Sequence, residues 1–130
     1  MEAETLAKII TKEFPSHQFA WKILGAVLKR TGRINESITF MRKSLQLNPQ
    51  DAEAYNNYGV TLQELGKLDE AEASYTKAIM LEPNYIEAHC NLGNTFKDQG
   101  KFDKAITAYN KVISIKPNNA EIYYNMGLAF

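Results

Sequence analysis

The sequence predicts an all-α protein, a solenoid of antiparallel helical hairpins stacked one on the next. The first observation is a period of 34 residues that fixes the position of every proline and every glycine. These are Pro15, Pro49, Pro83 and Pro117, then Gly25, Gly59, Gly93 and Gly127, and finally Gly32, Gly66 and Gly100. Both residue types interrupt regular backbone, so their shared period indicates one structural unit copied along the chain. The second observation is that apolar residues within each copy recur at helical spacing.

The period divides the chain into repeated units of a single domain. With Gln18 as the first position, complete units span 18–51, 52–85 and 86–119. We expect residues 1–17 to form an N-terminal half-unit that caps the stack. We expect residues 120–130 to form the first helix of an incomplete fourth unit.

The first helix of each unit carries an apolar face that ends at a glycine. In the middle unit the face comprises Tyr55, Tyr58, Gly59 and Leu62, at positions i, i+3, i+4 and i+7. The helix should stop at Gly66, as its equivalents stop at Gly32 and Gly100, because glycine adopts the left-handed C-terminal conformation without a Cβ penalty.

A second helix should follow at once and end before the recurrent proline. Asn35, Asp69 and Asp103 recur near its start, where a short polar side chain can cap free backbone amides. The residue before each proline is driven out of helical conformation, which ends the helix. Its apolar face reads Leu68, Ala71, Tyr75, Ala78 and Ile79 in the second unit and Phe102, Ala105, Tyr109, Val112 and Ile113 in the third.

Small residues should allow the two helices of a hairpin to approach closely. Gly59 faces Ala71, and Gly93 faces Ala105, so a bulky Tyr75 or Tyr109 can pack across the gap. Glycine inside a helix costs roughly 1 kcal/mol relative to alanine, so its recurrence there indicates a packing requirement.

The motif residues in these positions resemble the tetratricopeptide repeat, whose pattern is W-x₂-L-G-x₂-Y, then A-x₃-F, then P. The second unit matches with Tyr55, Leu62, Ala71 and Tyr75, and the third with equivalent residues through Pro117. The resemblance implies a right-handed superhelix with the first helix of each unit on the concave face. The first unit departs from the pattern at Ser37 and Met41, so we expect it to be less rigid.

Positions of the first helix that lie off the packing stripe are the candidate binding residues. In the first unit these positions hold Phe19, Lys22, Ile23, Ala26 and Lys29. From the later units we select a peptide-binding set on the concave face, which comprises Glu53, Asn56, Asn57, Val60, Glu87, Cys90, Asn91, Asn94, Lys97, Glu121, Tyr124 and Asn125.

Three asparagines, Asn57, Asn91 and Asn125, recur at the period and form a ladder along this face. An asparagine amide offers donors and an acceptor, so it can pair with a peptide unit of a bound chain. They resemble the asparagine ladder of the O-linked N-acetylglucosamine transferase, which holds extended polypeptide. Alternatively, asparagine here supports the neighbouring hairpin.

Charges at this face argue against a binding mode known in the family. Members that dock chaperone tails hold a carboxylate with cations at positions where this chain has Glu87 and Asn91. Glu53, Glu87 and Glu121 would instead attract neutral-to-basic peptides, unless neighbouring lysines already balance them.

Composition excludes several functional classes. Fifteen basic and fifteen acidic residues cancel, which leaves no electrostatic footprint for nucleic acid or an anionic membrane surface. The N-terminus has the charges Glu2, Glu4 and Lys8, so neither a signal peptide nor membrane insertion is expected. The single Cys90 cannot form an internal disulfide, which favours a reducing, cytoplasmic location.

The sequence indicates no catalytic residues, no metal site and no cofactor. His89 and Cys90 are adjacent on a helix and point about 100° apart, so they do not face each other as base and nucleophile. His89 stands where other units have Trp21 and Tyr55, which indicates a core position. Every glycine is assigned to repeat geometry, which leaves none for a phosphate-binding loop.

Both ends carry apolar residues. We expect Leu6, Ile9, Ile10 and Phe14 to form the face with which the N-terminal helix caps the stack. Tyr123, Met126 and Phe130 occupy packing positions of the last helix and are candidates for self-association, unless a longer polypeptide continues the stack.

Taken together, these features predict a protein-interaction scaffold whose concave groove receives an extended or helical peptide segment of a protein partner. One alternative is a substrate-recruiting module of a larger enzyme, similar to repeat modules that precede glycosyltransferase domains. A second alternative is a self-assembly unit that forms a homo-oligomer.

Overall fold

The computed structural model describes residues 2–118 together with 122 and 125, and within this part it contains only helices. The predictions for Glu121, Tyr123, Tyr124, Met126 and Phe130 lie outside the described residues. The helices are α1 (Glu2–Glu13), α2 (Gln18–Arg30), α3 (Ile34–Leu47), α4 (Ala52–Glu64), α5 (Leu68–Leu81), α6 (Ile86–Asp98) and α7 (Phe102–Ile115).

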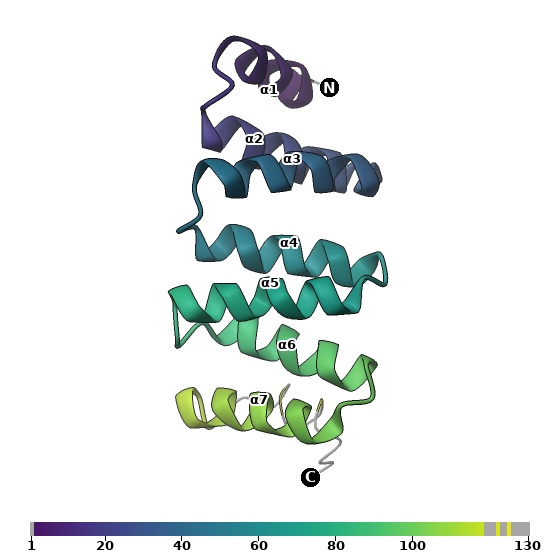
Figure 1. Ribbon diagram of the computed structural model, residues 1–130, viewed down its shortest axis with the longest axis vertical. Coiled ribbons are helices and arrows are strands. Elements are labelled where there is room, and N and C mark those ends of the chain that lie inside the picture. The colour runs from purple at the N-terminus through teal and green to yellow at the C-terminus, as the bar shows by residue number, and fades with distance from the viewer. Residues whose placement is uncertain (1, 119–121, 123–124, 126–130) are drawn as a thin grey trace.

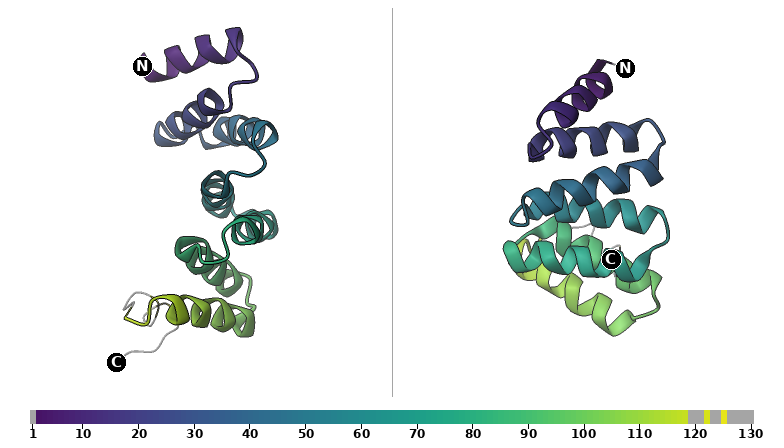
Figure 2. Two further views of the ribbon diagram at one scale, coloured as in Figure 1. Left: turned by 90° about the vertical axis from the view of Figure 1, so that its left-hand side faces the viewer. Right: turned by 45° about the horizontal axis from the view of Figure 1, so that its top comes forward.

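The helices stack in chain order along the long axis of the molecule (Figure 1). The pairs α2 and α3, α4 and α5, and α6 and α7 form antiparallel hairpins. In the left view of Figure 2, α2, α4 and α6 lie in one layer and α3 and α5 in the other, and α7 runs across beneath α6. The predicted all-α solenoid of helical hairpins is confirmed.

Each first helix ends where the sequence predicts, through a left-handed glycine. Gly32, Gly66 and Gly100 have φ values of 82°, 77° and 78°. At the first of these ends the amide of Arg33 donates to the carbonyl of Leu28 at 2.8 Å, and Gly32 donates to Lys29 at 3.1 Å. This paired bonding satisfies carbonyls that the helix end leaves free.

Each second helix begins without the predicted side-chain cap, so that prediction is wrong. The N-cap positions are Arg33, Lys67 and Lys101, and none makes a side-chain cap hydrogen bond. The helix starts so soon after the left-handed glycine that Asp69 and Asp103 already lie in the first turn. There the carboxylate interacts favourably with the positive end of the helix dipole, and it does not cap the helix.

The second helices end before their prolines, as predicted. Asn48, Glu82 and Lys116 are the C-cap residues, with extended ψ values of 88°, 93° and 84°. This conformation avoids the clash between the proline ring and the preceding residue.

The glycines inside the first helices receive the side chain of the partner helix, as predicted. A Cβ on Gly59 would lie 2.6 Å from Cε1 of Tyr75, and one on Gly93 would meet the ring of Tyr109 even more closely. Both tyrosine rings are buried. In the first hairpin Gly25 faces the flexible Met41, with a hypothetical Cβ contact of 3.0 Å.

Two predicted packing faces are more exposed than expected. Leu6, Ile9 and Phe14 are 58%, 50% and 60% exposed, because α2 is the helix against which α1 packs within the described residues, and it leaves these side chains uncovered. Phe102, at the start of α7, is 61% exposed, whereas Ala105, Tyr109 and Val112 of the same predicted face are buried.

Candidate functional site

A groove runs over the layer of first helices, between α2 and α4. Its volume is about 740 Å³, and part of α3 forms its floor. It is lined by Phe19, Lys22, Ile23, Ala26, Lys29, Arg30, Met41, Ser44, Glu53, Ala54, Asn57 and Glu64.

Three of the residues that α2 contributes to the groove are apolar. Phe19, Ile23 and Ala26 follow one another at helical spacing, so they share one side of the helix. Phe19 is 60% exposed, an uncommon position for a large aromatic ring without a partner. Met41 adds a flexible thioether from α3.

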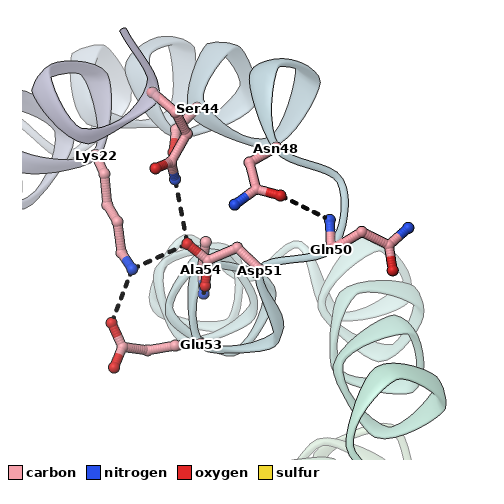
Figure 3. A network of polar contacts seen from close by, with 8 residues as sticks. Lys22, Ser44, Asn48, Gln50, Asp51, Glu53 and Ala54 are labelled. Atoms are coloured by element: carbon pink, nitrogen blue, oxygen red, sulfur yellow. Dashed lines mark hydrogen bonds and ion pairs between the residues drawn. The ribbon is translucent and has the colours of Figure 1, made fainter.

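A polar network joins α2 to the start of α4 along one edge of the groove (Figure 3). Lys22 Nζ lies 2.9 Å from Asp51 Oδ2 and 2.9 Å from Glu53 Oε1. Gln18 Nε2 donates to Asp51 Oδ2 at 3.1 Å and to Ser44 Oγ at 2.9 Å. Asp51 also caps α4, since its Oδ1 accepts from the amide of Ala54 at 3.0 Å.

The network stabilises the charged forms of Asp51 and Lys22. Burial raises the pKa of Asp51, but hydrogen bonds from Lys22 and the Ala54 amide outweigh burial, so the net pKa is lowered. Burial lowers the pKa of Lys22, but hydrogen bonds to Glu53 and Asp51 outweigh that effect, so the net pKa is raised. The edge of the groove is therefore a fixed ion pair rather than a pair of free charges.

The asparagines of the ladder have three different environments. Asn57 is exposed and lines the groove. Asn91 is half-buried, and its Nδ2 donates to Asn56 Oδ1 across α4 and α6 at 3.1 Å. The backbone carbonyl of Asn125 accepts from Lys97 Nζ at 3.4 Å. Asn57 offers its amide to solvent, whereas Asn91 supports the neighbouring hairpin.

Several residues of the predicted set serve packing. Asn56 is a correction, because it is only 3% exposed and bonded to Asn91. Asn94 accepts a hydrogen bond from the hydroxyl of Tyr109. Val60 packs against the core cluster that contains Tyr75, and Cys90 against the cluster that contains Tyr109.

Glu53 and Glu87 are both exposed on the first-helix layer, and they differ in their partners. Glu53 is balanced by Lys22, and Glu64 at the other end of the groove is 3.4 Å from Lys29. Burial, and after it the Glu87 and Glu53 carboxylates, raise the pKa of the Tyr85 phenol. At the groove itself, neighbouring lysines therefore balance the glutamates.

The predicted set omitted the apolar side of the groove. Phe19, Ile23 and Ala26 belong to the unit that departs most from the repeat pattern, and Met41 was named only as one of those departures. A signal was present, because Phe19 and Ile23 are four residues apart on one helix and occupy positions where the later units have glutamate and asparagine.

Other chemical roles have little support in the described part of the chain. No group of three or more His, Cys, Asp or Glu residues there is arranged to hold a metal ion. His89 is buried as predicted, with Nε2 2.8 Å from the carbonyl oxygen of Pro83. No described helix combines the length and apolarity needed to cross a membrane.

Family models match most of the chain. A model described as TPR repeat matches residues 62–100 and 93–130. Two models described as tetratricopeptide repeat match residues 40–73 and 20–51. No curated protein sequence matches the chain.

Solved structures with the same fold include several repeat proteins. A crystal structure of MamA is 31% identical, with a TM-score of 0.91 over 96% of this chain and 73% of that one. YrrB, described as a TPR protein with an unusual peptide-binding site, is 25% identical, with a TM-score of 0.80 over 85% of this chain and 57% of that one. The first TPR of Spaghetti (RPAP3), bound to an HSP90 peptide, is 23% identical, with a TM-score of 0.80 over 85% of this chain and 87% of that one.

Proposed function

The chain belongs to the tetratricopeptide repeat family, and on that premise we propose that it is a non-catalytic protein-interaction module. The groove between α2 and α4 receives an extended segment of a protein partner. One observation carries this proposal, namely the 60% exposure of Phe19 inside a preformed groove of about 740 Å³.

Apolar contacts supply most of the affinity. Phe19, Ile23 and Met41 present a continuous apolar strip, and covering a side chain such as phenylalanine contributes roughly 1.5–3 kcal/mol. The partner segment therefore carries at least one large apolar side chain. Because the groove is built from rigid helices, little binding energy is lost in ordering it.

Polar groups fix the direction of the bound segment. Asn57 is exposed opposite the apolar strip, where its amide can pair with a peptide unit of the ligand. Lys22 and Lys29 are already paired with Glu53 and Glu64, so the groove has little preference for a charged ligand. This balance replaces the expected preference for basic peptides.

The same groove would serve an isolated scaffold and the recruiting module of a larger enzyme equally well. YrrB supports the peptide-binding class, since it is described as having a peptide-binding site. A cytoplasmic location and self-assembly are further proposals, which rest on the single Cys90 and on the exposed apolar residues of α1.

Panning a phage-displayed random peptide library on the purified chain tests the proposal. We expect enriched peptides to contain large apolar residues and to bind the Phe19→Asp variant at least about tenfold more weakly, because the variant removes the apolar anchor. Asn57→Ala should weaken binding by about threefold to tenfold through loss of a hydrogen bond.

Matched controls exist on other surfaces. Met80 on α5 is 70% exposed and lies outside the groove, so Met80→Asp introduces the same chemical change elsewhere. Asn110→Ala on α7 is the control for Asn57→Ala. Peptides that bind the Phe19→Asp and wild-type proteins equally, or a library that yields no enriched peptide, would refute the proposal.

A further inference from the structure

A second groove lies on the opposite layer of helices, between α5 and α7, with α6 beneath it. Its volume is about 410 Å³, and its floor is formed by His89, Leu92 and Phe96. Its walls are Thr76 and Ile79 on α5 and Lys104, Thr107, Ala108 and Lys111 on α7. None of these residues lines the groove between α2 and α4.

The equivalent place one repeat earlier is partly filled by the protein itself. There Tyr58 stands where Leu92 stands, and its hydroxyl accepts a hydrogen bond from Arg42 Nε on α3 at 2.7 Å. Thr76 is the equivalent of Arg42 and is too short to span the gap. The depression at this earlier place has a smaller volume, about 270 Å³. Substitution of a tyrosine and an arginine by smaller residues has therefore opened the second groove.

The rim of the second groove is cationic. Lys104 and Lys111 project from α7, and the Nζ of Lys104 lies 5.8 Å from the centre of the Phe96 ring. Within the residues that the structure describes, no ion pair joins either lysine to a carboxylate. By contrast, Lys101 is paired with Glu72 at 3.1 Å. One repeat earlier the equivalent of Lys104 is Glu70, so the charge at this point is reversed.

We propose that this groove is a second docking site, for an acidic peptide segment of another protein that carries a large apolar side chain between carboxylates. The apolar side chain covers Leu92 and Phe96, and the carboxylates pair with Lys104 and Lys111. Both features are needed, because isolated surface ion pairs add little affinity and mainly give specificity.

The spacing of the lysines sets the spacing of the carboxylates. Lys104 and Lys111 are seven positions apart on α7, which corresponds to about 10 Å along the helix axis. In an extended peptide, side chains on the same face are two or four positions apart, about 7 or 13 Å, and the long lysine side chains can span the difference from about 10 Å. The simplest matching core is therefore two glutamates four positions apart, with a large apolar residue midway between them on the same face.

A fluorescein-labelled peptide with the core Glu-Ser-Phe-Ser-Glu is the probe, and its counterpart with lysine in place of glutamate is the comparison. Fluorescence anisotropy should show saturable binding of the acidic peptide that weakens as salt is added. The lysine peptide should not saturate up to about 1 mM. Equal binding of the two peptides, or no binding of either, would overturn the proposal.

Two groove variants test the location of the site. Lys104→Glu with Lys111→Glu should weaken binding of the acidic peptide by at least roughly tenfold, since attraction is replaced by repulsion. Leu92→Tyr with Thr76→Arg copies the closure of the preceding repeat and should weaken binding similarly without harming the fold. Retained binding by both variants would overturn the proposal.

Two control variants complete the experiment. Lys12→Glu with Lys67→Glu makes the same change in net charge at exposed positions outside both grooves and should leave affinity unchanged. Phe19→Asp disables the groove between α2 and α4 and should also leave affinity unchanged. A loss of affinity in the Phe19→Asp protein would assign the acidic peptide to that first groove and overturn the second site.

Discussion

The junction between the first and second repeats differs sharply from the junction between the second and third. At the first, Gln18, Lys22, Ser44, Asp51 and Glu53 form a partly buried polar network. At the second, the equivalent positions hold Ala52, Asn56, Ala78, Tyr85 and Glu87. The alanines there are 4% and 0% exposed, so the second junction is closed mainly by apolar contact.

The hairpins beside these junctions also differ, because the later hairpins are more tightly packed than the first. Tyr75 and Tyr109 pack directly on the glycines of α4 and α6, whereas Met41 makes the corresponding contact in the first hairpin. Apolar residues of α2 are thus left in the groove instead of in a junction. The comparison indicates that the same repeat fold gives tightly packed hairpins in the later repeats and a more open groove beside the first repeat.

The largest expected effect comes from filling the tight hairpin. Gly93→Leu should lower the free energy of unfolding by about 3 kcal/mol, because the new side chain must displace the buried ring of Tyr109. Gly25→Ala is the comparison, with an expected loss below about 1 kcal/mol, because Met41 can move aside. Urea denaturation measures both. Similar losses of unfolding free energy in the two variants would contradict the difference in packing between the two hairpins.

Removing the central carboxylate of the first junction should have the next largest effect. Asp51→Ala loses the cap of α4 and leaves Lys22 without its partly buried partner, for a loss of about 2 kcal/mol. Asp51→Asn keeps a capping oxygen and should lose about 1 kcal/mol. If the two variants were equally stable, the capping bond would contribute nothing to the junction.

The stability that Asp51 contributes should depend on pH at the acid end. Its pKa in the folded protein is below the ordinary value of 3.8, so its contribution is complete above that value and is lost as pH falls through the lowered pKa. The difference in melting temperature between wild type and Asp51→Asn should therefore shrink in that range. A difference in melting temperature that stayed constant until Asp51 was fully protonated would contradict the ion pair between Asp51 and Lys22.

At the alkaline end, Lys22 and Tyr109 report on the two regions separately. The pKa of Lys22 is raised above 10.5, so its contribution to the free energy of unfolding is complete below that value and is lost as pH rises through the raised pKa.

Burial, with the nearby Asp98 carboxylate, raises the pKa of Tyr109 to about 12. A Tyr109→Phe variant should therefore lack an absorbance change near pH 12, and loss of a change near pH 10 instead would place that ring in solvent.

The smallest effect on stability should come from the residue most important for binding. Phe19→Ala should change the free energy of unfolding by less than about 0.5 kcal/mol, because the ring is 60% exposed. Thermal unfolding monitored by circular dichroism is a sufficient measurement. A large destabilisation would mean that Phe19 belongs to the core of the first repeat rather than to a groove.

The repeat period predicts nearly all of the helical architecture, because proline, glycine and apolar spacing act locally on the backbone. The helix caps could not be predicted so well. The tight turn after Gly66 consumes only one residue before α5 begins, which moves Asp69 into the first turn. That displacement depends on three-dimensional turn geometry, not on the preference of the aspartate.

The binding residues were predicted less completely. Asn56 and Asn57 are adjacent and chemically identical, yet one is 3% exposed and the other lines the groove. Adjacent residues on a helix point about 100° apart, and the packing of α6 decides which of the two is covered. The sequence alone therefore does not distinguish the buried asparagine from the exposed one. Phe19 was placed off the packing stripe, but it was left out of the predicted set because that set was drawn from the later units alone.

The most direct test of the central claim is to map a library-selected peptide onto the chain by amide chemical-shift perturbation in two-dimensional nuclear magnetic resonance spectra. We predict that titration shifts the signals of α2 and α4, with the largest changes near Phe19, Ile23 and Asn57, and leaves the exposed side of α5 around Met80 unchanged. Changes confined to α5, α6 and α7, with α2 unaffected, would contradict the account.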